Sequence, residues 1–198
     1  MASWMWGVDI IEALARCGAL TASEICDQTG IERASAYRVL EQLEAQGWVV
    51  GGSRPKKYAL GTRVAETGMP AVRRLPGRAV LLPFLAELSE AIGRHAQLTF
   101  YQRGGRVFSS DRADVIAGRV VVQALFVSTR AALTSSGKVL LAYQDASELD
   151  AVAARGLKRL TEFTLVTADE IRASVADARS RGYGRVDREF DLNQSGFA

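Results

Sequence analysis

Four residues with hydrogen-bond donors lie close together in the stretch RASAYR, namely Arg33, Ser35, Tyr37 and Arg38. Guanidinium and hydroxyl groups bind phosphate oxygens and the edges of bases, so contact with nucleic acid is the chemistry that these side chains could do. If a helix begins here, the positive end of its dipole adds attraction for phosphate. The alternative is a helix face in contact with water only, where arginine and serine are ordinary residues.

The surrounding residues predict three helices and a hairpin. Apolar residues recur at helical spacing over residues 4–16, and Thr21 with Glu24 forms a capping-box pattern that opens a second helix. A third helix is predicted over residues 33–46, with Ala36 in its apolar stripe. The stretches WVV and KKYALG flank a turn rich in Gly, Ser and Pro, which predicts a β-hairpin. This order is that of a winged helix-turn-helix, whose third helix enters the DNA major groove.

We therefore expect two groups of DNA contacts. The first turns of the third helix would read the major groove, and the basic hairpin would lie along the flanking phosphates or the minor groove. The predicted DNA-binding residues are Arg33, Ser35, Ala36, Tyr37 and Arg38 in the helix, and Arg54, Lys56 and Lys57 in the hairpin.

The charge distribution agrees with focused binding rather than with a polybasic tail. The formal net charge of the 198 residues is +3. Residues 1–62 carry six Lys/Arg against seven Asp/Glu, whereas residues 63–78 carry four against one. Two prolines interrupt the basic segment 63–78, which is typical of a linker that either passes beside DNA or lies in water.

The remaining sequence predicts a second domain of mixed strands and helices. An apolar helix is expected over residues 79–93, followed by a hairpin around Gly104-Gly105, a further strand, short helices and a final strand. The predicted fold class is α+β, with a winged helix-turn-helix over residues 1–62, a linker over 63–78 and a sheet domain over 79–198.

Several stretches, in this order and spacing, resemble the IclR family of transcriptional regulators over nearly the whole chain. They are SEICDQTGIERASAYRVLEQLEAQGWV, KYALG, TSSGKVLLA, LTEFTLVTADEI, RSRGYGRVDREFDL and NQSGFA. The resemblance implies a sequence-specific DNA-binding regulator with a linker helix and a GAF-like effector-binding domain. It also implies dimers or tetramers on palindromic operators and a small effector, a carboxylate or an aromatic acid.

The same resemblance implies where the effector binds. Backbone N–H groups at the start of the SSGK helix would hold its anionic group, which points to Ser135 and Ser136. The chain departs from the family pattern at Ala132, where histidine is common. It also stops at GFA, where family members continue through two more strands, so we expect a truncated sheet with an open edge. The predicted effector-binding residues are Ser135, Ser136, Asp187 (beside Val186) and Gly196.

Two other classes of function remain open at this point. The first is a DNA-binding dimer whose second domain is a remnant that binds no effector. An enzyme with a winged-helix dimerisation module is the other, but Gly104-Gly105 falls in a hairpin and not after a parallel strand. We therefore expect no enzyme activity.

The sequence also lacks the patterns of other sites. Two Cys and one His are too few for a structural zinc site, and SSGKV has neither the first glycine nor the Ser/Thr of a phosphate-binding loop. We expect no metal and no cofactor. Asp187, Glu189 and Asp191 alternate at strand spacing, so they predict a solvated strand face or, alternatively, a paired-carboxylate site. No long apolar run or basic leader is present, so we expect a cytoplasmic protein without a membrane segment.

Overall fold

The structure is a computed structural model, and it describes residues 3–52 and 56–198. The chain divides into two compact units, residues 1–75 and 76–198, and each is described by itself. No helix of the described residues is both long enough and apolar enough to cross a membrane.

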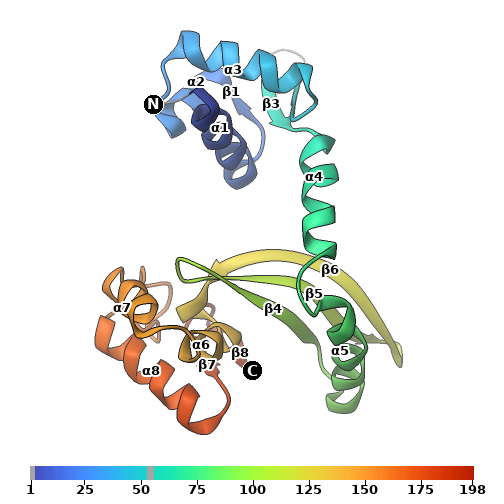
Figure 1. The fold of residues 1–198 in the computed structure, drawn as a ribbon, viewed down its shortest axis with the longest axis vertical. Helices are drawn as coiled ribbons and strands as arrows, with labels where there is room; N and C mark the ends of the chain where they lie inside the picture. Colours follow the sequence, from blue (N-terminus) through green and yellow to red (C-terminus); the bar gives the residue numbers. More distant parts are fainter. Residues whose placement is uncertain (1–2, 53–55) are drawn as a thin grey trace. The chain divides into compact units, whose positions relative to one another are not determined.

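The first unit is a winged helix-turn-helix with four helices and a small antiparallel sheet (Figure 1). The three strands pair in the order β1-β3-β2. The elements are α1 (Ser3–Cys17), β1 (Leu20–Thr21), α2 (Ala22–Thr29), α3 (Arg33–Ala45), β2 (Val49–Gly51), β3 (Lys57–Leu60) and α4 (Thr62–Arg73).

Local sequence signals fix the two ends of α2, the helix that precedes α3. The Thr21 hydroxyl accepts from the Glu24 backbone N–H while the Glu24 carboxylate accepts from the Thr21 N–H, so the predicted capping box opens α2. Gly30 ends α2 at φ 70°, a conformation that favours glycine. The core beneath is apolar and includes Ile10, Ile25 and Leu40, all fully buried. These contacts hold one face of α3 against the unit and leave the opposite face free.

Most of the predicted linker is one helix. α4 runs through Pro70, although proline removes a backbone donor and disfavours helix interiors. None of its residues is buried. The prediction of a segment broken at Pro70 is therefore wrong at that residue, and the helix ends only at Arg73.

The second unit combines an antiparallel sheet with helices (Figure 1). Its main sheet has the order β4-β5-β6, and β7 pairs with β8 in a separate hairpin. The elements are α5 (Arg78–Ile92), β4 (Ala96–Gln102), β5 (Arg106–Ile116), β6 (Arg119–Arg130), the 3-10 helix η1 (Ala131–Leu133), α6 (Ser135–Ala142), α7 (Ala146–Ala154), α8 (Ala168–Arg181), β7 (Arg185–Asp187) and β8 (Ser195–Phe197).

The core of this unit brings α6, α7 and α8 together beside one end of the sheet. Leu141 of α6 and Ile171 of α8 are almost fully buried in it, as is Val107 of β5. A second capping box, Thr167 with Glu170, opens α8 as the sequence predicts. The helices thereby set the position of the first turn of α6.

Helix α5 packs on the sheet less fully than its sequence predicts. Leu85 is buried, and the Ser89 hydroxyl donates to the Ala113 carbonyl of β5 at 3.2 Å. Leu88 and Ile92, which follow Leu85 at helical spacing, are each 51% exposed. Only a narrow stripe of the helix is covered by the described residues.

Candidate functional site

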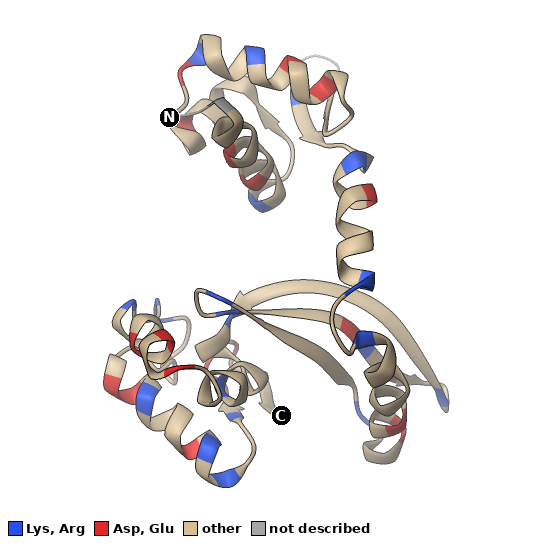
Figure 2. Cartoon of the chain, viewed as in Figure 1, with Lys and Arg blue, Asp and Glu red and all other residues tan. Residues whose placement is uncertain are grey.

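The exposed face of α3 carries four of the eight predicted DNA-binding residues, and Figure 2 shows basic positions along this helix. Arg33, Tyr37 and Arg38 are exposed, and Ser35 is half-buried. The Arg33 guanidinium lies 5.8 Å from the centre of the Tyr37 ring, a spacing that holds the two side chains together on one helix face. The donors are therefore gathered in the first turns of the helix, where its backbone N–H groups also lack intrahelical partners.

Ala36 is a correction to the predicted DNA-binding set. Its side chain is fully buried and packs in the apolar core of the first unit. Ala36 lies one position from Ser35 and from Tyr37, which is about 100° around the helix, so it faces the core when they face outward. It cannot reach a base, and its role is to let α3 approach the core closely.

The hairpin is tied to α3 through Glu44. One carboxylate oxygen of Glu44 accepts from the Gly51 backbone N–H at 3.1 Å, and the other lies 3.1 Å from the Lys56 ammonium. The hydrogen bond from Lys56 to Glu44 also raises the pKa of Lys56. Lys57 is exposed and has no ion pair among the described residues. Arg54 lies outside the described residues.

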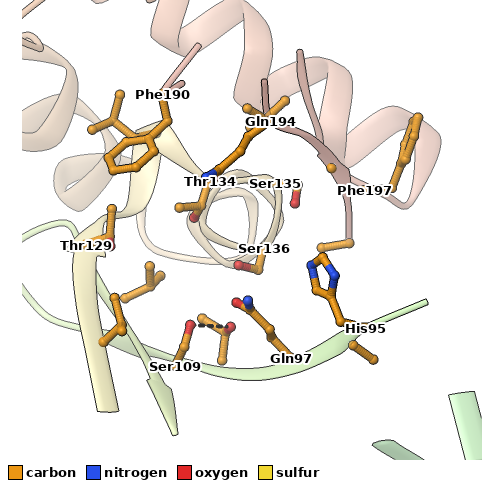
Figure 3. A pocket seen from close by; sticks show the side chains of 18 of the residues that line it. His95, Gln97, Ser109, Thr129, Thr134, Ser135, Ser136, Phe190, Gln194 and Phe197 are labelled. Carbon is orange, nitrogen blue, oxygen red and sulfur yellow. Dashed lines mark hydrogen bonds between the residues drawn. The ribbon is translucent and has the colours of Figure 1, made fainter. Parts of the chain in front are cut away.

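A cavity of about 470 Å³ lies in the second unit between the main sheet, the start of α6 and the β7–β8 hairpin (Figure 3). Its walls combine apolar side chains with hydroxyl and amide groups, and no Asp, Glu, Lys or Arg of the described residues lines it. The polar lining side chains are His95, Gln97, Thr99, Ser109, Thr129, Thr134, Ser135, Ser136, Gln194 and Ser195. Such a cavity matches a ligand with an apolar body and a few polar groups.

The first turn of α6 faces this cavity. The Thr134 hydroxyl accepts from the Gly137 backbone N–H at 3.0 Å, so Thr134 caps the helix. The N–H groups of Ser135 and Ser136 precede that bond and have no intrahelical acceptor. A side chain at Gly137 would meet the Ala131 carbonyl oxygen at 2.1 Å, so the turn can pack there only with glycine. The arrangement leaves donors for an anionic group at the helix N-terminus.

Three of the four predicted effector residues line the cavity, and one does not. Ser135, Ser136 and Gly196 are in its walls. Asp187 is a correction, because its neighbour Val186 faces the cavity and successive strand residues point to opposite faces. The Asp187 carboxylate instead accepts hydrogen bonds from Arg188 and Ser195, which lower its pKa.

The sequence analysis missed several polar residues of the cavity, including its single histidine. His95, Gln97 and Thr99 all line it from β4 and the residue before it. Ser109 of β5 shares a hydrogen bond of 3.0 Å with Thr99, drawn as a dashed line in Figure 3. The signal was present, since positions 95, 97 and 99 follow the period of two that places strand residues on one face.

The predicted alternation of Asp187, Glu189 and Asp191 on one strand face is wrong. β7 ends at Asp187, and Glu189 turns inward, where its carboxylate pairs with the buried Lys138 ammonium. No paired-carboxylate site forms, because the structure neutralises Glu189 with Lys138 and leaves Asp187 at the surface.

Comparison with protein families gives two matches. Residues 7–51 match the IclR helix-turn-helix domain, and residues 69–194 match the bacterial transcriptional regulator IclR C-terminal domain. The second match alone covers more than half of the chain.

Relatives and solved structures agree with these matches. The chain is 27% identical over 186 residues to the HTH-type transcriptional regulator BhcR of Paracoccus denitrificans, covering 92% of this chain and 65% of that protein. It is 24% identical to the transcriptional repressor IclR of Escherichia coli, covering 94% and 69%. The crystal structure of an IclR transcriptional regulator from Alicyclobacillus acidocaldarius superposes with a TM-score of 0.80 at 23% identity, covering 98% and 79%. The chain thus spans about two thirds of the length of the curated relatives it matches.

Proposed function

Because the chain belongs to the IclR family of bacterial transcriptional regulators, we propose that it binds a specific DNA operator and regulates transcription in the cytoplasm. The observation that carries the proposal is the gathering of exposed donors on the first turns of α3, on the face opposite the core. We propose a homodimer or tetramer as the working form and a role without catalysis.

The proposed interface has two parts. Arg33, Ser35, Tyr37 and Arg38 read the major groove. Lys56 and Lys57, with Arg54 by sequence alone, contact the flanking phosphates. Lys56 must exchange its Glu44 partner for phosphate, which costs little because the ion pair is exposed to solvent.

The 470 Å³ cavity is the proposed effector site. No Lys or Arg of the described residues lines it, which favours a single carboxylate over a phosphate, since the helix N-terminus and hydroxyl groups would hold the anion. The apolar walls, among them Val107, Phe190 and Phe197, fit a hydrocarbon or aromatic body. One support comes from an IclR homologue from Microbacterium hydrocarbonoxydans, which was crystallised with 4-hydroxybenzoate and superposes with a TM-score of 0.76 at 22% identity.

DNA recognition is tested by fluorescence anisotropy. The purified protein is titrated onto the intergenic DNA beside its own gene and onto a scrambled duplex of equal length, across a salt series. We expect affinity for the native fragment to be at least about 10³-fold higher, with a salt dependence that corresponds to several phosphate contacts. Absence of binding at low salt to either duplex contradicts the proposal.

Effector binding is tested by thermal unfolding in the presence of benzoate, 4-hydroxybenzoate, pyruvate and other small carboxylates. A ligand at 100 times its dissociation constant stabilises the protein by about 2.7 kcal/mol, which is readily measured. If only uncharged analogues stabilise the protein, the assignment of the α6 N-terminus to a carboxylate is wrong.

A further inference from the structure

A second, smaller cavity lies where the β4–β5 turn meets the end of β6 and the end of α7, and three arginines line it. Its volume is about 160 Å³, and it shares no lining residue with the 470 Å³ cavity. Arg106 comes from the start of β5, Arg130 from the end of β6 and Arg155 from the end of α7. Figure 2 shows basic residues at the end of the β4–β5 hairpin where β5 begins.

Two of these arginines are direct cross-strand partners. Arg106 and Arg130 lie opposite each other in the antiparallel register of β5 and β6. Like charges in that position destabilise a sheet, because neighbouring side chains on opposed residues are only about 5 Å apart at their Cβ atoms. Arg155 adds a third positive charge to the same cavity.

Neutral groups hold these guanidinium groups in place. Arg130 donates to the Gly156 carbonyl at 3.0 Å, and Arg155 donates to the Gly104 carbonyl at 2.8 Å. Arg106 donates through Nε to the Ser128 hydroxyl at 3.1 Å. These bonds fix orientation without neutralising charge, and each guanidinium keeps further N–H donors.

No carboxylate of the described residues lies within 4.0 Å of any of the three arginines, unlike Arg78, Arg112 and Arg172 in the same unit. Hydrogen bonds from Tyr101 and Gly104 lower the pKa of Glu148, and the charge of Arg155 adds to this effect. One of the Glu148 oxygens accepts from the Tyr101 hydroxyl and from the Gly104 and Gly105 backbone N–H groups. Arg106 and Arg130, which are both exposed to solvent, therefore have no carboxylate partner among the described residues.

We propose that this three-arginine cavity binds a small phosphate-type dianion. Guanidinium groups bind tetrahedral oxyanions through paired N–H donors, and a dianion would offset the repulsion between Arg106 and Arg130. The volume suits a single phosphate group and is smaller than the roughly 300 Å³ at which drug-sized ligand sites begin. This site is separate from the proposed effector site, so the protein would bind a second small ligand at a different place.

Calorimetric titration of the full chain with inorganic phosphate, at constant ionic strength set with chloride, tests the proposal. We expect saturable binding of one phosphate per chain. Arg106→Gln and Arg130→Gln should each weaken it at least about tenfold, because each removes a charge-assisted hydrogen-bond donor group. Arg119→Gln is the matched control, because it removes the same charge from the other end of β6. Far-UV circular dichroism establishes that each variant is folded.

Two results would overturn the proposal. One is a failure of the phosphate titration, seen either as no saturable binding by the wild-type chain or as an equal loss in Arg119→Gln. The other is a DNA result: if Arg130→Gln lowers the salt slope of DNA binding by about one unit while phosphate binding is absent, the arginines contact the DNA backbone instead. Phosphate binding that needs Arg106 and Arg130, with unchanged DNA binding, supports a free phosphate-type ligand.

Discussion

The ammonium nitrogen of Lys138 lies 2.6 and 2.8 Å from the two carboxylate oxygens of Glu189, and the Lys138 side chain is only 2% exposed. Lys138 belongs to α6, whose first turn lines the large cavity, and Glu189 follows β7 on the segment that carries Phe190 and Gln194 into the same cavity. Lys138 also donates to the Arg185 carbonyl, and the Thr164 hydroxyl donates to the Glu189 carbonyl. One ion pair thus joins two walls of the proposed effector site.

Removing one partner of this pair should destabilise the second unit strongly. Lys138→Met leaves the Glu189 carboxylate buried without a countercharge, which costs about 3–5 kcal/mol. Urea unfolding followed by far-UV circular dichroism measures the loss. The three tryptophans, Trp4, Trp6 and Trp48, all lie in the first unit, so their fluorescence reports that unit separately.

The double variant Lys138→Met/Glu189→Leu is the control for that experiment. It removes both charges, so it should recover most of the stability that Lys138→Met loses, because an apolar pair can replace a buried ion pair. If the single variant unfolds at the same urea concentration as wild type, the pair does not carry the stability we assign to it.

Arg38 and Lys57 should affect DNA binding in different ways. Arg38→Ala is expected to cost about 1–3 kcal/mol on the operator and little on random DNA, because a base contact is sequence-specific. Lys57→Ala should weaken both duplexes alike and lower the salt slope by about one unit. Anisotropy on both duplexes measures the two effects. Equal losses on both duplexes for Arg38→Ala would make Arg38 a phosphate contact.

Substitutions at Thr134 and Ser136 should have different effects, one on the capping of α6 and the other on ligand binding. Thr134→Ala removes the cap of α6 and should cost about 1 kcal/mol in urea unfolding without ligand. Ser136→Ala removes a hydroxyl from the cavity wall and should change stability by no more than about 0.5 kcal/mol. In a titration with the best-binding carboxylate, Ser136→Ala should raise the dissociation constant. Unchanged affinity would place the carboxylate away from the α6 N-terminus.

The second capping box should make stability depend on pH in the acid range. Hydrogen bonds from the Thr167 backbone N–H, the Thr167 hydroxyl and the Val166 N–H lower the pKa of Glu170 below its ordinary value of 4.5. A lowered pKa contributes stability that is present above the unfolded-state pKa and is lost as pH falls through the folded-state pKa. Glu170→Gln does not titrate, so its deficit in urea unfolding should shrink as pH falls from neutral to below 4.5. Exposed Glu87→Gln is the matched control, and a deficit for Glu170→Gln that is constant with pH would contradict the prediction.

Local signals in the sequence predicted much of the first unit. Thr21 with Glu24, and Gly30 at the end of α2, define helix ends through contacts within a few residues, so no tertiary knowledge is needed to find them. The same holds for Thr167 with Glu170 in the second unit. The face of α3 followed from its helical period, although including Ala36 among the DNA contacts ignored the apolar stripe to which it belongs.

The sequence by itself determined the helices and the hairpin of the winged helix-turn-helix, the capped helix ends and the donor-rich start of α3, because these depend on local spacing along the chain. Only the tertiary structure decided which strand residues face the cavity, since a period of two gives two opposite faces and the packing of neighbours selects one. That selection turned Asp187 away and brought His95 to the cavity wall. It also buried Glu189 against Lys138, 51 residues away, and gathered Arg106, Arg130 and Arg155 around one cavity. Charges distant in sequence meet only when the chain folds, because their contacts depend on long-range packing that no local pattern encodes.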